Sequence, residues 1–190
     1  MKTMATRISD DAILDAVIAT LIEHGYAGAT TREIASTAGV NEVTLFRRFE
    51  SKQGLVLAAI RRDTGLAGHS AMSASGDLEA DLLAVLEYFV EVYRAHARLP
   101  LVLILEASRN PELESLIRGP LTLQRELRKL IAIYQRSGEL INEPPAHTAN
   151  ALVGPLLAYG ADAQLGIAPA GGPPDASLLL RRFLDGHSAA

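Results

Sequence analysis

The sequence predicts an all-α fold in which a helix-turn-helix head precedes a larger helical-bundle body. Apolar residues recur at helical spacing along most of the chain, capping residues stand in front of them, and no run shows the alternation typical of strands. The chain has 190 residues, 48% of them apolar and 21% charged. A chain of this length buries a core without disulfides or metals. It contains no cysteine, which excludes a disulfide scaffold and zinc–thiolate sites.

The N-terminal part of the chain predicts one long helix and three shorter ones. In the first, apolar residues from Ile13 to Leu21 follow the spacing of a core-facing helix that stops near Gly25. Each helix has a capping residue in front of it, and the expected caps are Ser9, Thr30, Asn41 and Ser51. Glu33 follows Thr30 at the spacing of a capping box. The last three helices are expected over residues 31–38, 42–49 and 52–65.

A stretch rich in Gly, Ser and Ala over residues 64–76 predicts a linker, and longer helices follow it. Prolines open two of these helices, Gly138 ends a third, and Asp175 caps the last. The expected ranges are Asp77–His96, Pro100–Arg109, Pro111–Gly119, Leu121–Ser137, Ala146–Gly166 and 176–186. We therefore expect a head over residues 1–62 and a body over residues 63–190.

The second and third helices meet in a pattern that predicts a helix-turn-helix motif. Ala35 is small enough for close helix packing, and Gly39 can adopt the left-handed conformation that the turn demands. Leu45 lies six residues further on and points back between the helices. The second helix of such a motif lies in a DNA major groove. A plain αα-corner in a helical protein is the alternative for this pattern alone.

Charge is distributed unevenly between the two parts. The net charge is −4, which argues against binding of polyanions over the whole surface. Residues 1–62 carry eight Lys and Arg against seven Asp and Glu, whereas the remainder carries ten against fifteen. The positive charge of the head gathers between Arg47 and Lys52, where it can contact phosphates beside the groove. The candidate DNA-binding residues are Thr31, Arg32, Asn41, Glu42, Val43, Thr44, Phe46, Arg47, Arg48 and Lys52.

From about Ile8 to Ile60 the chain resembles the N-terminal domain of the tetracycline-repressor (TetR) family of bacterial regulators. The residues that carry the resemblance are Gly25-Tyr26, Thr30 to Ala35, Ala38-Gly39-Val40, Thr44 to Phe49, and Ser51-Lys52 with Leu55. The resemblance implies DNA contacts by Thr44 and Phe46, a phosphate contact by Lys52, and packing by Val40, Leu45 and Phe49. Phe46 stands where the family commonly has tyrosine, and Arg48 stands where it commonly has histidine.

The body carries candidates for a dimer interface and for a ligand cavity. Residues 149–163 are apolar nearly all round, so that helix must be buried on more than one face. We expect it to be shared between the core and a dimer interface, and the resemblance implies that it pairs with its copy; the candidate interface residues are Leu152, Leu156, Tyr159, Leu180 and Phe183. A central core helix in a monomer is the alternative. A mostly apolar cavity for a hydrophobic or amphipathic effector is expected in the body. Its candidate lining residues are Tyr88, Tyr93, Leu103, Glu106, Tyr134 and Tyr159.

Together with the resemblance, these patterns predict a homodimeric, ligand-responsive transcriptional repressor of double-stranded operator DNA that is not an enzyme. No catalytic constellation, cofactor motif or helical pair of metal-binding histidines stands out. No signal peptide or membrane span is expected, so we predict a cytoplasmic protein. Two alternatives stay open: a helical-bundle enzyme that kept the head as a corner, and a DNA-binding regulator controlled by a partner protein.

Overall fold

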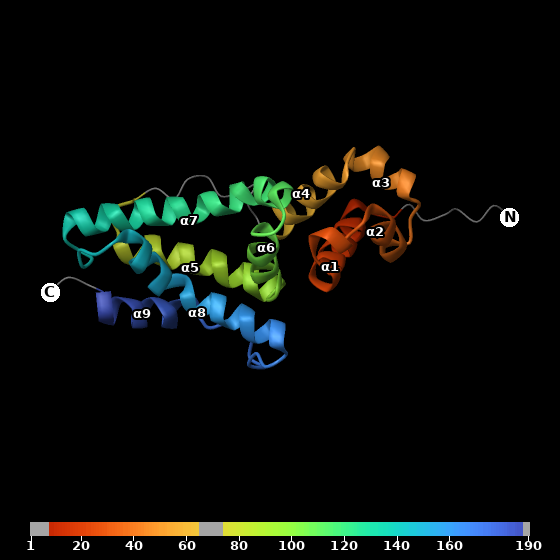
Figure 1. Ribbon diagram of the computed structural model, residues 1–190. Helices are drawn as coiled ribbons and strands as arrows, with labels where there is room; N and C mark the ends of the chain where they lie inside the picture. The colour runs from red at the N-terminus through yellow and green to blue at the C-terminus, as the bar shows by residue number, and fades with distance from the viewer. Residues whose placement is uncertain (1–7, 65–73, 188–190) are drawn as a thin grey trace. The chain divides into compact units, whose positions relative to one another are not determined.

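The chain folds into helices that gather in two compact units. The computed structural model describes residues 8–64 and 74–187, leaving aside the side chains of residues 118–122, and these residues form helices α1 to α9 (Figure 1). The first unit contains the chain up to Arg62 together with Val102–Ile117, and the second contains Asp63–Leu101 and the chain from Arg118 onward. The sequence places residues 102–117 in the body, whereas their contacts group them with the head. The functional boundary after Arg62 stays a prediction.

The four helices of the head begin where the sequence predicts. They are α1 (Asp10–Gly28), α2 (Thr31–Ala38), α3 (Glu42–Phe49) and α4 (Lys52–Asp63). All four predicted caps are confirmed, because the side chain of each accepts a backbone N–H of the first turn: Ser9 from Ala12, Thr30 from Glu33, Asn41 from Val43, and Ser51 from Gly54. The regular helix breaks at Gly25, near where the sequence predicts its end, because Gly25 has φ 67° and ψ 180°; helical residues resume after this kink and α1 ends at Gly28.

Apolar burial joins these short helices to α1. Ile13 and Val17 of α1 are fully buried, and so is Ile34 of α2, which contacts both α1 and α3. Leu45 is the buried residue of α3, with 1% of its surface exposed. Val40 and Phe49, which the family resemblance assigns to packing together with Leu45, are half-buried. One strongly buried side chain thus holds α3 against the head and leaves its other face open.

The second unit is built around an apolar cluster from four helices. Its elements are α5 (Leu78–Ala95), the part of α7 (Pro111–Ser137) from Arg118 onward, α8 (Pro145–Leu165) and α9 (Ala176–His187). Helix α6 spans Leu99–Ala107. The cluster includes Leu86, Leu130 and Leu156, each no more than 1% exposed. Helices α5, α8 and α9 contact one another pairwise.

One boundary predicted for the body is wrong. The sequence predicts a break at Gly119-Pro120, between one helix that ends at Gly119 and another that begins at Leu121. Helix α7 instead runs without interruption from Pro111 to Ser137. The proline ring holds φ near the helical value, so a helix continues through proline when the loss of one backbone hydrogen bond is tolerated. The predicted end before Gly138 is confirmed, with Gly138 at φ 84°.

Candidate functional site

The turn between α2 and α3 has the geometry that the motif predicts. Gly39 ends α2 in the left-handed conformation, with φ 66° and ψ 32°. Its N–H donates back to the last turn of α2, and the N–H of Val40 donates to the carbonyl of Ala35 at 3.0 Å. These bonds satisfy carbonyl groups that would otherwise be left unpaired at the helix end. The chain then enters α3 at Asn41, so the direction of α3 is set by the turn.

Two candidate DNA-binding residues bind each other across that turn. The hydroxyl of Thr31, in the first turn of α2, donates a short hydrogen bond to the Glu42 carboxylate, in the first turn of α3. Both side chains are half-buried. The pair therefore fixes the beginning of α3 relative to α2, a role that no sequence pattern indicates for either residue.

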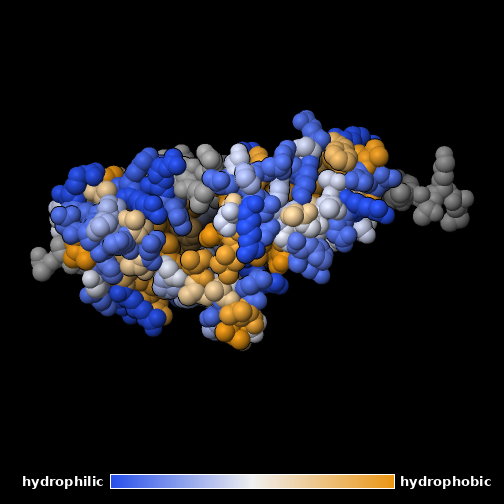
Figure 2. Space-filling view, in the orientation of Figure 1, coloured by the Kyte–Doolittle hydropathy of each residue, from blue (hydrophilic) through white to orange (hydrophobic). Residues whose placement is uncertain are grey.

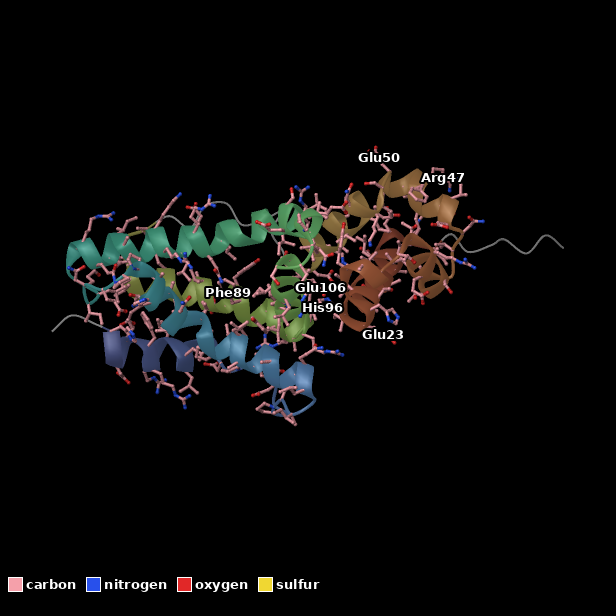
Figure 3. All side chains as sticks on the ribbon, in the orientation of Figure 1. Glu23, Arg47, Glu50, Phe89, His96 and Glu106 are labelled. Carbon is pink, nitrogen blue, oxygen red and sulfur yellow. The ribbon has the colours of Figure 1, made fainter. Side chains whose placement is uncertain are left out.

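The outer face of the motif presents a mixed apolar and basic surface. Val43 is 71% exposed and Phe46 is 46% exposed, and Figure 2 shows the hydrophobic surface over α3 to which these two residues belong. Arg32 and Asn41 are also exposed, as is Arg47, which Figure 3 labels at α3, whereas Thr44 is half-buried. Large apolar side chains held in water beside arginines are typical of a contact surface. These residues form what we call the α3 face: Arg32, Asn41, Val43, Thr44, Phe46 and Arg47.

Arg48 turns away from the α3 face. Its Nη1 donates to the carbonyl of Ile8 at 2.8 Å and to the Asp10 carboxylate at 2.9 Å. The arginine side chain is only 11% exposed. This geometry gives Arg48 a structural role that the sequence did not predict, because its guanidinium ties α3 to the start of α1; the predicted DNA contact of Arg48 stays a prediction.

Lys52, the first residue of α4, is held by the end of α1. Its ammonium donates to the Tyr26 carbonyl at 2.6 Å and lies 4.3 Å from the centre of the Tyr26 ring. Burial lowers the pKa of Lys52, and the nearby Glu112 carboxylate partly opposes that shift. The sequence singled out Lys52 but gave Tyr26 and Glu112 no role, because neither belongs to a basic or turn pattern. The bond to the Tyr26 carbonyl uses one of the three ammonium donors.

The predicted ligand-lining residues are divided between the two units. Leu103 and Glu106 belong to the first unit and the four tyrosines to the second. Tyr134 is 2% exposed and donates to the Asp81 carboxylate, which gives it a structural role. Tyr93 packs edge-on against Tyr159 with ring centres 6.5 Å apart. Tyr88 is half-buried and donates to the carbonyl of Thr64.

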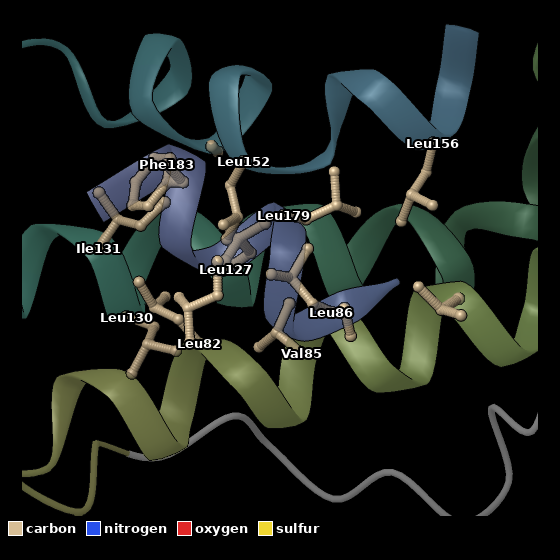
Figure 4. Packing of buried hydrophobic residues seen from close by; sticks show 14 of the residues in the cluster. Leu82, Val85, Leu86, Leu127, Leu130, Ile131, Leu152, Leu156, Leu179 and Phe183 are labelled. Atoms are coloured by element: carbon tan, nitrogen blue, oxygen red, sulfur yellow. The ribbon is translucent and has the colours of Figure 1, made fainter. Parts of the chain in front are cut away.

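Most of the predicted dimer residues lie in the core of their own chain. Figure 4 shows Leu152, Leu156 and Phe183 pointing into the apolar cluster, where they are 1%, 0% and 5% exposed. Leu180 is 7% exposed, and Tyr159 is half-buried. This placement corrects the prediction, since these residues are covered without a second copy. Other residues of the two helices face outward, and the apolar ones among them include Ala151, Pro155, Leu157, Ala158 and Leu165 on α8 and Leu178 on α9.

Two open hollows of the described part of the chain can be compared with the predicted cavity, and the smaller, of about 370 Å³, lies between α5 and α9 beside Leu83 and Leu184. The larger has a volume of about 950 Å³ and lies at the start of α5, bordered by Asp77, Leu83, Glu139 and Leu180 among others. None of the six candidate ligand residues borders either hollow. Among the described residues no helix is long and apolar enough to cross a membrane, and no three His, Asp or Glu side chains gather as metal ligands.

Comparison with known proteins identifies relatives of both parts of the chain. Residues 13–59 match the family described as bacterial regulatory proteins, tetR family. Over 153 residues the chain is 31% identical to the HTH-type transcriptional regulator RutR of Escherichia coli (strain K12), covering 77% of this chain and 71% of RutR. It is 42% identical over 79 residues to the uncharacterized HTH-type transcriptional regulator YvkB of Bacillus subtilis (strain 168). That match spans 42% of each chain, less than half of the relative's own length.

A solved structure has a similar fold throughout. The crystal structure of an HlyIIR mutant protein superposes with a TM-score of 0.72 at 19% identity, covering 93% of this chain and 94% of that one. The likeness therefore extends beyond the matched head and includes the helical body.

The two adjacent arginines of α3 provide a matched test of these assignments. Arg48→Ala removes the donor to the Ile8 carbonyl, and we expect it to lower the free energy of unfolding by about 1 kcal/mol. The contribution of the exposed Asp10 partner is small because water screens it. Arg47→Ala should change stability by less than about 0.5 kcal/mol. Urea unfolding followed by circular dichroism measures both, and equal stabilities of the two variants would contradict the structural role of Arg48.

Proposed function

Because this chain belongs to the TetR family of bacterial regulatory proteins, we propose that it is a ligand-responsive transcriptional repressor that binds a palindromic operator as a homodimer. The observation that carries the proposal is the α3 face, an apolar and basic surface on a helix whose position is fixed by the turn. An α-helix fits the major groove of B-DNA, and side chains on its outer face reach the base edges. Against a plain helical corner, the proposal is supported by the combination of exposed Val43 and Phe46 with the exposed Arg47 on one short helix.

Within this proposal the α3 face divides into base-reading and phosphate-binding parts. Val43, with 71% of its surface exposed, is placed to meet thymine methyl groups on the groove floor, with Thr44 beside it. Arg47 and Arg32 are exposed cations for phosphates on either side of the groove. Lys52 adds a phosphate contact from the start of α4. Two copies of α3 in a dimer would enter successive major grooves, roughly 34–36 Å apart.

A homodimer is supported by the outward surface of α8 and α9. Leu157 of α8 is 41% exposed and Leu178 of α9 is 37% exposed. Helix α8 also exposes Ala151 and Ala158, whose small side chains permit a second helix to approach closely. Figure 1 shows α8 and α9 as neighbouring helices, and their contact supports a shared surface. We propose that the interface consists of these outward residues, while the inward leucines of the same helices fill the core.

We further propose that the second unit binds a hydrophobic or amphipathic small molecule near Tyr88, Tyr93 and Tyr159. These tyrosines combine apolar rings with hydroxyl groups, which suits a guest that is mostly apolar with a few polar atoms. A ligand there changes DNA affinity only if it prefers one arrangement of the two heads over another. No cofactor is required by this mechanism.

Selection of duplexes from a random pool tests DNA binding directly. We expect the unmodified chain to enrich a two-fold symmetric site with half-sites about one helical turn apart. Val43→Ala should relax the preference at the contacted base pair, at a cost of about 1–3 kcal/mol in discrimination for a lost base contact. Glu139→Ala, an exposed change in the second unit, is the matched control and should select the same site. Enrichment of no sequence by the unmodified chain would rule out operator binding.

The dimer interface can be tested by placing one charge on the outer face of α8. Ala158→Arg should convert the dimer to a monomer while preserving the helical circular dichroism spectrum, because an unpaired buried charge costs several kcal/mol. Ala84→Arg on the exposed side of α5 introduces the same charge outside that face and should leave the dimer intact. Light scattering gives the mass of each variant. A dimer that survives Ala158→Arg would place the interface elsewhere.

If a ligand changes the affinity for operator DNA, the operator must change the affinity for the ligand by the same factor, and this reciprocity can be tested. Small apolar and amphipathic compounds that raise the melting temperature would be titrated with and without the selected operator. We expect the two affinities to differ by roughly 5–150-fold, the usual range for coupled sites. Binding of equal strength in the two titrations would show that the compound does not regulate DNA binding.

A further inference from the structure

Every polar group of Tyr26, at the end of α1, is bound by a residue from another helix of the first unit. Its N–H donates to Glu106 Oε2 at 2.6 Å, and its hydroxyl donates to Glu112 Oε2 at 3.1 Å. Its carbonyl accepts from the Lys52 ammonium, which also lies over its ring. Tyr26 is 4% exposed, and the three bonds to it are partly buried. Helices α4, α6 and α7 therefore meet at one residue of α1.

The bond from Tyr26 to Glu106 exists because of the residue before it. Gly25 has φ 67° and ψ 180°, a backbone state that turns the following N–H out of the regular helix pattern. A Cβ on Gly25 would lie 2.8 Å from Glu106 Oε2, so the carboxylate occupies the space that the missing side chain leaves. A buried N–H without an acceptor is strongly unfavourable. Glu106 supplies that acceptor from α6, and its own position is supported by the Asn110 amide.

We propose that Glu106 is a positioning residue for DNA binding, which acts by holding Tyr26 and, through the carbonyl and ring of Tyr26, the ammonium of Lys52. The proposal rests on the phosphate role of Lys52 in the proposed function. Glu106 lies outside the residues that match the family model and was expected to anchor a ligand. A movement of α6 would reach Lys52 through two hydrogen bonds in series, Glu106 to Tyr26 and Tyr26 to Lys52.

Whether DNA affinity rises or falls when Glu106 is replaced distinguishes a positioning role from a simple charge effect. Removing a carboxylate from a DNA-binding unit reduces repulsion of the phosphates, so the charge change alone favours binding. Loss of the Tyr26 bond acts in the opposite direction, because Lys52 is then free to leave the position set by α1. Glu23, labelled with Glu106 in Figure 3, is a carboxylate on α1 whose side chain is 74% exposed, and Glu23→Ala measures the charge effect by itself.

The test compares variants of Glu106 on the duplex that the unmodified chain selects. Glu106→Ala should weaken binding about tenfold, the factor that corresponds to about 1.4 kcal/mol. Glu106→Gln should stay within about twofold, since its amide oxygen can still accept from Tyr26. Glu106→Asp keeps the charge but is one methylene too short, so it should behave like Glu106→Ala. This variant carries the test if Glu106→Ala proves unfolded by circular dichroism.

Two further readouts distinguish positioning from general loss of stability. If Lys52 neutralises one phosphate per half-site, Lys52→Ala reduces the steepness of log affinity against log salt by about 0.9 for each phosphate contact that is lost. Glu106→Asp should flatten that slope as well, and the double variant should bind no more weakly than Lys52→Ala alone. Unchanged affinity and slope in Glu106→Asp, or fully additive losses in the double variant, would overturn the positioning role. Absence of DNA binding by the unmodified chain would instead remove the proposed function itself.

Discussion

The first unit depends on one hydrogen bond at the break in α1, because the buried N–H of Tyr26 requires an acceptor. Gly25 leaves the helical conformation, and the N–H that follows it finds the carboxylate of Glu106. Because Tyr26 also binds Glu112 and Lys52, the start of α4 is placed by segments far away in the chain. Residues 102–117, which contain Glu106 and Glu112, belong to the unit of the head, although they lie between α5 and the other helices of the second unit in sequence.

Helix α3 shows how a short helix is held while one face remains open. An eight-residue helix is marginal in isolation, so tertiary contacts must stabilise it. Leu45 supplies apolar burial, the Thr31–Glu42 pair fixes the first turn, and Arg48 ties the last turn to the start of α1. These contacts use the inner and flanking positions of the helix. The residues left over, Val43 and Arg47 among them, form the surface that the proposed function assigns to DNA.

Some apolar residues of the body fill its core and others face outward, and the sequence composition does not show which residues do which. Leu152 and Leu156 fill the core of the second unit, whereas Leu157 and the alanines beside it face outward on the same helix. Tyrosines are divided in a similar way. Burial raises the pKa of Tyr134, and the hydrogen bond to the Asp81 carboxylate raises it further, while Tyr88 and Tyr159 are less deeply buried.

The sequence by itself determined the features that depend on neighbouring residues: the helical class, the four caps of the head, the left-handed Gly39 and the bounds of α3. A cap or a turn bonds within about four residues, so its partners are visible in the sequence. Only the tertiary structure decided which polar side chains are free for a partner. Arg48, Lys52 and Glu106 bind backbone groups 40, 26 and 80 positions away, because a charged side chain that is partly buried bonds to whatever donor or acceptor the fold brings beside it.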